Sequence, residues 1–439
     1  MYGGLKMTLE NMKAADPNFV MGQVMSLGLD LISLGRTLQG DTELKQEIEK
    51  LESLSKQQAC VLTSREQSHI KAVQLWADGY LHEATSMWDD ILVDHPSDMF
   101  AIRMAYDSNF SQGHLPQMRD LIARVFPRWK PTTPLYSYLF GQYAFGLEET
   151  NFYYKAENLS RKGLELNPKD AWATHALAHV LEMEGRTNEG IAFMSSTVKN
   201  WEVNNLLVCH NFWHWAVYHI EQGELEAAMD IFDTQVGKKL HSGSFLDISD
   251  ATALLYRLEL EGYEINVNGD LTMSIYMGAQ VKDRWREVSE VCRTYIEDHT
   301  SAFNDTHIFM SCLGAKDENA TKLLMNSLDQ YIRETKGVSS KVSAKVGRKI
   351  IQALLAYDEE RYEDVVSLLY PLRYEIVEIG GSNAQRDVFN LLLIHATLKS
   401  SNSHHHSLAQ SLLYERKALK EGSPMTDRLM ARVLALHLS

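Results

Sequence analysis

Two short stretches of the sequence carry histidines at a spacing that suits metal binding or acid–base chemistry. One reads WATHALAHVLEMEG, and the other, about one helical repeat later, reads CHNFWHWAVYH. Each contains a pair of histidines in an i, i+4 arrangement, His175 with His179 and His210 with His214. On a helix this spacing places both imidazoles of a pair on one face, where they can bind the same ion.

The acidic residue nearest to the first pair is Glu182, which follows one turn after His179. It lies about 10 Å of helix rise from His175, so it can approach only His179. Ala176 occupies the place where the zinc-protease motif needs a general-base glutamate. Three interpretations are open: a site for a divalent metal such as Zn, a ligand-binding patch, and packed structural histidines that hydrogen-bond to their neighbours.

Two further motifs bring polar groups into apolar surroundings. Cys209 precedes His210, but adjacent residues on a helix point about 100° apart, so a buried structural thiol is the preferred interpretation. In GGSNAQRD the two glycines predict a helix end, and Ser382 or Asn383 predicts the cap of the next helix. We expect Arg386 and Asp387 to hydrogen-bond between helices.

The elements that must position these residues are helices in a repeating pattern. The chain contains 9 prolines in 439 residues, which leaves long stretches free to be helical. Second-helix anchor residues recur at intervals of 34 to 38 residues, the length that a pair of antiparallel helices needs. These anchors are Ala84, Met118, Ala156, Gly190 and Ala228. The helix pairs are expected to turn at Gly79, Gly113, Asn151, Gly185 and Gly223.

The repeats predict an all-α, superhelical solenoid of the tetratricopeptide type. We expect capping helices over residues 1–63, five helix pairs over 64–236, and degenerate repeats that continue the same solenoid over 237–439. The tract SSNSHHHS, residues 400–407, is expected to be a solvated loop.

Composition narrows the partners and the compartment. The formal net charge of -15 predicts no binding to nucleic acid or to anionic membranes, since both need concentrated positive charge. Four scattered cysteines without C-x-x-C spacing indicate a reducing setting, and neither a signal peptide nor an apolar stretch long enough to span a membrane is present. A cytoplasmic location is expected.

The chain resembles the tetratricopeptide repeat protein 38 family over essentially its whole length. The matching stretches are KAADPNFVMG, WDDILVDHPSDM, FGLEETNFYYKAE, NPKDAWATHALAHVLEM, CHNFWHWAVYHIE, FNDTHIFMSCLGA and GGSNAQRDVFNLLLIHATL. The resemblance implies a fold and brings no catalytic residue, ligand or partner. Relatives usually carry a further N-terminal segment, so a leading helix is expected to be missing here.

Similarity to tetratricopeptide repeats implies that certain first-helix positions face a concave groove. Numbering each unit from its anchor predicts the following groove residues: Trp172, His175, His179, Glu182, His210, Trp213, His214, Arg103 and Asp107. The numbering also places His69, Phe145 and Glu148 at groove positions. A polar groove of mixed charge follows, with the four histidines and Glu182 on one concave patch.

The preferred functional interpretation is a binding or scaffold protein whose groove takes a peptide, a partner segment or a small polar ligand. The alternative is an enzyme or a metal-dependent ligand-binding protein that uses the histidine cluster. In that case His179 or His214 would serve as base or ligand, with Glu182 or Asp250 in support. An open groove would favour the first interpretation, and a deep closed pocket at the histidines would favour the second.

Overall fold

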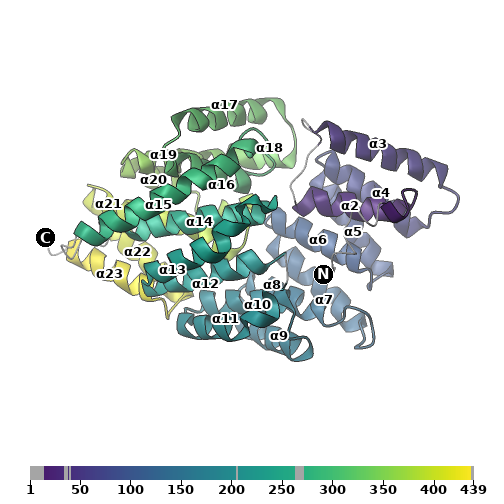
Figure 1. Cartoon of the computed structure of the whole chain (residues 1–439), viewed down its shortest axis with the longest axis horizontal. Helices are drawn as coiled ribbons and strands as arrows, with labels where there is room; N and C mark the ends of the chain where they lie inside the picture. Colours follow the sequence, from purple (N-terminus) through teal and green to yellow (C-terminus); the bar gives the residue numbers. More distant parts are fainter. Residues whose placement is uncertain (1–13, 34–37, 39–40, 204–205, 263–270, 437–439) are drawn as a thin grey trace.

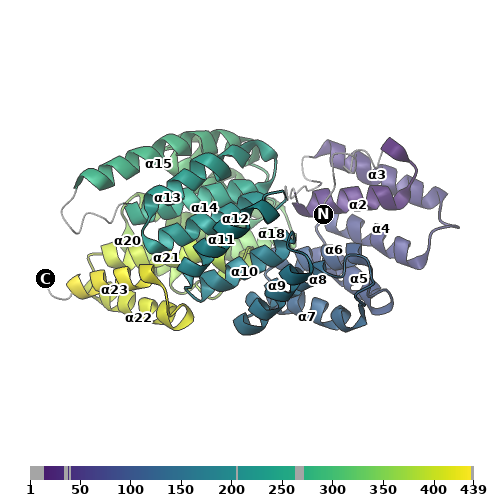
Figure 2. The ribbon, with the colours of Figure 1, turned by 60° about the horizontal axis from the view of Figure 1, so that its bottom comes forward.

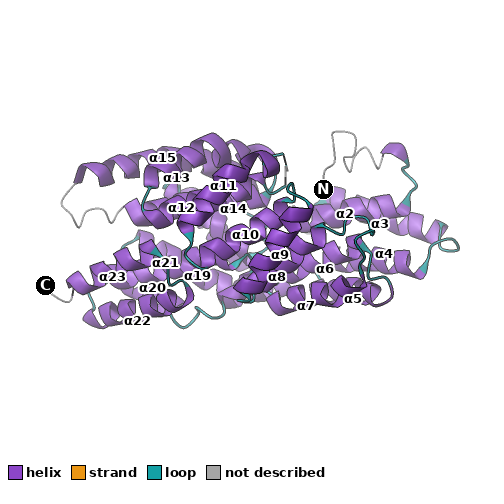
Figure 3. Ribbon diagram, turned by 90° about the horizontal axis from the view of Figure 1, so that it is seen from below, coloured by secondary structure: helices purple, strands orange, loops and turns teal. Residues whose placement is uncertain are grey.

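A computed structural model describes residues 14–33, 38, 41–203, 206–262 and 271–436 of this chain. All regular secondary structure in these residues is helical, and Figure 3 shows no strand among them. The fold is an all-α superhelical repeat fold, as the sequence predicts. No helix in the described ranges has the length and apolarity needed to cross a membrane.

The first half of the chain is a stack of paired helices behind two N-terminal ones. The N-terminal helices are α2 (Val20–Ser33) and α3 (Thr42–Gln57). The pairs are α4 (Ser64–Ala77) with α5 (Leu81–Asp94), α6 (Met99–Ser111) with α7 (Leu115–Val125), α8 (Tyr138–Glu148) with α9 (Tyr153–Leu166), α10 (Ala171–Met183) with α11 (Thr187–Trp201), and α12 (Val208–Gln222) with α13 (Leu225–Ile231). In Figure 1 this stack runs from the purple α2 and α3 to the teal α12.

The predicted turns and anchors are confirmed. All five turn residues have positive φ: Gly79, Gly113, Asn151, Gly185 and Gly223. Glycine and asparagine tolerate this left-handed conformation, which ends one helix and reverses the chain into the next. All five anchors are buried: Ala84, Met118, Ala156, Gly190 and Ala228. Gly190 of α11 lies against Tyr218 of α12, the first helix of the next unit.

The second half of the chain continues with helices of less regular length. Its helices are α14 (Phe245–Gly262), α15 (Leu271–Cys292), α16 (Ala302–Gly314), α17 (Glu318–Glu334), α18 (Val338–Val342), α19 (Arg348–Asp358), α20 (Tyr362–Leu369), α21 (Asn383–Lys399), α22 (Ser403–Leu419) and α23 (Pro424–Leu436). Short 3-10 or π-helical pieces join several of them, at Phe126–Arg128, Phe232–Val236, Gly237–Ser242, Arg293–Tyr295, Ser343–Gly347 and Ile376–Ile379. The prediction of a loop over residues 400–407 is wrong from residue 403 onward. Asn402 caps α22, and the three histidines lie in the first turn of that helix.

The second half folds back against the repeats. Figure 2 shows the yellow α22 and α23 beside the teal helices that lie far earlier in the sequence. Arg428 at the start of α23 donates to the carbonyl of Glu221 at the end of α12, over 2.9 Å. The buried apolar residues form two large clusters, one mainly N-terminal and one mainly C-terminal. Helix α10 supplies residues to both, so it lies where the two cores meet.

Candidate functional site

Helices α10 and α12 carry the four histidines because the repeat places their first helices next to each other. Asp170 caps α10, and its carboxylate accepts from the backbone N–H of Trp172 at 3.0 Å. On the other side α10 meets α8 at very close range, since a Cβ on Gly141 would lie 2.5 Å from the backbone nitrogen of Ala173. This close approach brings the end of α8 against the histidine-bearing face of α10.

The four imidazoles converge into one cluster. The ring centroids of His179 and His214 are 4.3 Å apart, those of His175 and His179 4.4 Å, and those of His210 and His214 4.7 Å. One ligand nitrogen from each ring lies within 4.8 Å of the other three. His175 and His210 are 3% exposed, and His179 and His214 are fully buried. The cluster is therefore a part of the protein interior.

Buried carboxylates surround the cluster and contact the Nδ1 atoms of three rings. Asp250 from α14 accepts from His210 Nδ1 at 2.8 Å, and Glu182 accepts from His214 Nδ1 at 2.9 Å. His179 Nδ1 lies 3.5 Å from Glu148 and 3.8 Å from Glu149, where α8 ends. These contacts assign the proton to Nδ1 and leave Nε2 of the bonded rings as an acceptor.

The first residues of α21 hydrogen-bond to one of these carboxylates, that of Glu149. Ser382 caps α21 in a capping box with Gln385, and the backbone N–H of Asn383 donates to both carboxylate oxygens of Glu149, at 2.9 and 3.0 Å. The guanidinium of Arg386 lies 3.5 Å from the same carboxylate and donates to the carbonyl of Gly381. The predicted capping and interhelix role of GGSNAQRD is confirmed.

Burial governs the protonation of the whole cluster. It lowers the pKa values of His175, His179 and His214 well below their ordinary range, and the neighbouring imidazoles lower them further. Burial also raises the pKa values of the surrounding carboxyl groups, most strongly that of Glu148, beside the carboxylate of Glu149. These three histidines are neutral near pH 7, which is the form that binds metals.

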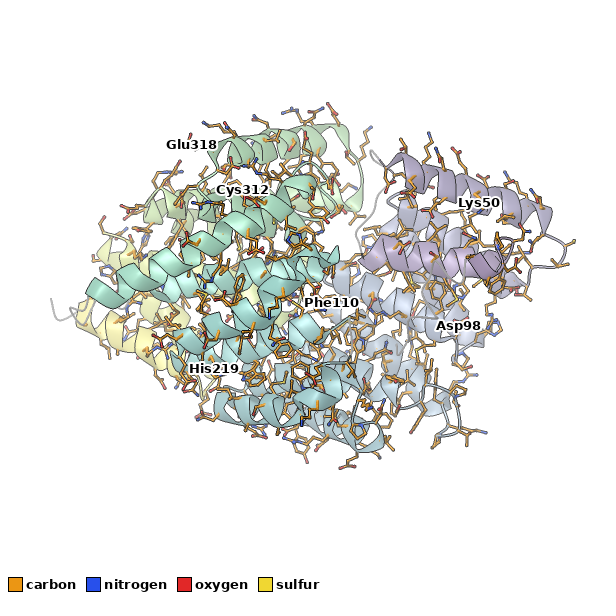
Figure 4. All side chains as sticks on the ribbon, in the orientation of Figure 1. Lys50, Asp98, Phe110, His219, Cys312 and Glu318 are labelled. Carbon is orange, nitrogen blue, oxygen red and sulfur yellow. The ribbon has the colours of Figure 1, made fainter. Side chains whose placement is uncertain are left out.

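A large cavity lies beside the cluster. It has a volume of about 930 Å³ and is lined by residues from both halves of the chain. Arg103 lies over the ring of Trp172 at 5.0 Å and pairs with Asp107 at 2.5 Å, and all three side chains line the cavity. Figure 4 labels a fourth lining residue, Phe110, at the junction between the pale blue N-terminal helices and the teal central ones.

The cavity and the histidines touch through two residues. Trp172 lines the cavity and packs edge-on against His175, with ring centroids 5.4 Å apart. Gln385 also lines the cavity, and its amide donates to Asp250 at 3.5 Å. The cavity wall is therefore one side chain thick at the histidine cluster.

The structure separates the predicted groove residues into two groups. Arg103, Asp107 and Trp172 line the cavity, as expected of a concave face. The four histidines and Glu182 come together as predicted, but the expected open concave patch is wrong because they are buried. Helix α14 packs against α12, and α21 packs against α10 and α14, next to the helices that carry the histidines. Trp213 is fully buried as well, stacked on His210 with ring centroids 5.2 Å apart.

Some residues that surround the histidine cluster could not be predicted from the sequence. No role is predicted for Glu149, although it directly follows Glu148, which the repeat numbering places in the groove. Asp250 is predicted only as a supporting residue in the catalytic alternative, and no role is predicted for Gln385. The partners of His210 and Glu149 lie 40 and 234 residues away in the sequence, and no repeat spacing connects them.

The chemistry available at the cluster is that of neutral imidazoles and acidic groups, without a thiolate. Burial and the nearby Asp250 raise the pKa of Cys209 well above its ordinary value, so its thiol stays protonated. The four histidines offer nitrogen ligands to one ion. Glu148, Glu149 and His179 form a second group whose ligand atoms lie equally close.

Comparisons with known proteins give distant matches to solved structures. No family model matches the chain. It aligns with the human IFIT1 dimer with m7Gppp-AAAA at 14% identity and a TM-score of 0.41, over 98% of this chain and 95% of that chain. For the IFIT1 monomeric mutant with Gppp-AAAA, the values are 14% identity, a TM-score of 0.43 and coverage of 98% and 94%. At this identity and these TM-scores the likeness carries no conclusion about this chain.

The expectation that the charge excludes nucleic acid as a partner is wrong. The aligned IFIT1 structures hold m7Gppp-AAAA, Gppp-AAAA and PPP-AAAA. A net charge sums the whole surface, whereas a local site can hold a nucleic-acid end regardless of that sum. The charge of -15 therefore does not exclude nucleic acid as a partner of this chain.

Proposed function

We propose that this chain is a binding protein that holds a compact ligand in the cavity lined by Arg103, Asp107 and Trp172. The supporting observation is the cavity itself, whose volume of about 930 Å³ lies within the range of small-molecule sites, roughly 300–1,000 Å³. Its wall combines aromatic rings with a few polar groups, which is typical of sites that bury an apolar body and orient it by its polar edge.

The same proposal includes a family and a location. The collinear stretches quoted above support membership in the tetratricopeptide repeat protein 38 family. The four cysteines are free, three of them buried, which suits the reducing conditions of the cytoplasm. The alternative in which His179 or His214 acts as a catalytic base has less support, because both side chains are fully buried in this structure.

Binding of 1-anilinonaphthalene-8-sulfonate, an aromatic probe with a polar edge, tests the cavity. Isothermal titration calorimetry should find one saturable site per chain, and Trp172→Ala should weaken its affinity about tenfold or more. The matched control is Trp215→Ala. Trp215 is also half-buried, but it stacks on Phe212 with ring centroids 6.1 Å apart and does not line the cavity.

Three outcomes separate the occupants. Binding that both tryptophan variants weaken alike, or no saturable binding at all, contradicts the cavity as the site. Saturable binding that only Trp172→Ala weakens supports it. If a peptide pool displaces the probe and a library of small molecules does not, the occupant of the cavity is a partner segment and the proposal of a compact ligand is wrong.

A further inference from the structure

We propose that His175, His179, His210 and His214 bind one divalent transition-metal ion, and that zinc fits the site best. The proposal concerns the buried cluster and does not depend on what the neighbouring cavity binds.

The first argument is the distance between the ligand atoms. Zinc binds imidazole nitrogens at about 2.0–2.1 Å, so tetrahedral ligands stand about 3.3 Å from one another. In the cluster, Nε2 of His175 lies 2.9 Å from Nε2 of His179, and all four ligand nitrogens lie within 4.8 Å of one another. The measured separations bracket the separation that a tetrahedral zinc site requires.

The second argument is the direction of the rings. His210 and His214 each donate Nδ1–H to a carboxylate, at 2.8 and 2.9 Å, and His179 directs its Nδ1 toward Glu148. Metal-binding histidines almost always donate their second nitrogen to a carboxylate, carbonyl or water, which fixes the tautomer and orients the ring. Two of the four histidines, His210 and His214, have that arrangement before any ion is considered, and His179 has a carboxyl group 3.5 Å from its Nδ1.

The third argument is the balance of donors and acceptors. When Nδ1–H of His214 is bonded to Glu182, its Nε2 can only accept, and that atom has no hydrogen-bond partner among the described residues. The contact between His175 and His179 uses one proton and satisfies that pair alone. Buried polar atoms are normally paired, so an acceptor nitrogen that lies among three other imidazoles without a hydrogen-bond partner favours a cation as its partner.

The choice of metal follows from the ligand type and the charge. Four nitrogen ligands without thiolate suit zinc and its first-row neighbours, whereas calcium and magnesium require oxygen ligands. Neutral imidazoles leave the charge of the ion uncompensated, and the carboxylates of Asp250 and Glu182, which accept from His210 and His214, lie next to the rings to balance it.

The second group of close ligand atoms, Glu148, Glu149 and His179, is a weaker candidate. Glu149 already accepts two hydrogen bonds from the backbone of Asn383 and lies 3.5 Å from the guanidinium of Arg386. We therefore place these two glutamates behind the ion that the four histidines bind, and assign them no second ion.

The test begins with metal analysis of the purified full-length chain. After removal of metal with a chelator and addition of zinc, elemental analysis should find one zinc per chain. Cobalt in its place should give the visible absorption of a tetrahedral nitrogen site, without the intense near-ultraviolet band that thiolate ligands produce. No stoichiometric binding of either ion, or a thiolate band, would overturn the proposal.

Variants locate the ion. Replacement of His179 and His214 together by Gln should abolish stoichiometric binding, and Glu182→Gln, which alters only the support of His214, should weaken zinc affinity about 10–100-fold. His69→Gln is the matched control. His69 is also buried and also bonds a carboxylate, that of Asp98 at 3.1 Å, but it lies outside the cluster.

Two results decide the assignment. Retention of one zinc by the double histidine variant, or an equal loss of affinity in His69→Gln, overturns it. If the double variant does not fold, the cobalt spectrum of the native chain and the affinity of Glu182→Gln decide, and an unchanged affinity in Glu182→Gln then counts against the site.

Discussion

The turn between α10 and α11 tests how the second half docks on the repeats. Gly185 has a φ of +72°, and a Cβ there would lie 2.7 Å from the carbonyl carbon of Gly422 and 2.8 Å from the nitrogen of Ser423. Gly79 provides a matched comparison at the turn between α4 and α5. Its φ is +84°, and no atom of the described residues lies within 4 Å of the added Cβ.

The two substitutions share one cost and differ in another. At either glycine, alanine must adopt the left-handed conformation, which costs about 1–2 kcal/mol. At Gly185 the methyl group also presses on backbone atoms of the α22–α23 connection, and overpacking of this kind adds about 1–3 kcal/mol. We therefore expect Gly79→Ala to lower the free energy of unfolding by about 1–2 kcal/mol and Gly185→Ala by roughly 2–5 kcal/mol.

Urea unfolding gives the free-energy difference, and amide hydrogen exchange shows where it acts. Repeat proteins can unfold in parts, so amide hydrogen exchange, which is measured residue by residue, is the decisive measurement. Gly185→Ala should accelerate exchange around Gly422 and in α23, whereas Gly79→Ala should leave exchange there unchanged. Equal destabilisation by the two variants, with no change around Gly422, would refute the docking of the C-terminal helices on this turn.

Three other changes test the remaining interfaces. Enlarging Ala156, a fully buried anchor, to Leu should cost about 1–3 kcal/mol by overpacking, and an unchanged melting temperature would contradict the repeat register. Ser382→Ala should remove the cap of α21 and cost about 1 kcal/mol in urea unfolding, against no change for the exposed Ser53→Ala. Burial would raise the pKa of Asp387, but Arg416 holds it at about 2. Because this folded pKa is lower than the unfolded value of about 3.9, the pair stabilises the protein fully above that value. Acid titration of stability should therefore show a loss of roughly 2–3 kcal/mol as the pH falls from about 5 to 1, which is absent in Asp387→Asn.

The sequence was sufficient for the features that depend on local spacing. The turns could be placed because glycine and asparagine adopt positive φ after a helix, and five such residues recur at the repeat interval. The pairing of His175 with His179, and of His210 with His214, follows from helix geometry. Their convergence follows from the repeat, since it sets the first helices of consecutive units side by side.

The surroundings of the cluster could not be predicted because they depend on long-range packing. The repeat numbering assumes that no other helix packs on the concave face. In the structure α14 packs against α12, and α21 packs against α10. Asp250 bonds His210, and Asn383 bonds Glu149. Both residues lie in helices that do not follow the repeat interval of the first five units. A polar residue in a helix of the second half therefore gave no signal that its partner was a histidine or glutamate of the first half.

The makeup of the buried cluster is itself an argument for function. Four imidazoles and four carboxyl groups lie in a region where a simple helical stack would bury leucine and alanine at no electrostatic cost. Burying ionisable groups is unfavourable unless they are paired, and Glu148 is fully buried beside a second acid, Glu149. Sites that break the rule of apolar packing without a structural gain tend to be functional sites. A bound cation would supply the gain here, because it would pair the histidine nitrogens and balance the acidic groups behind them in a single step.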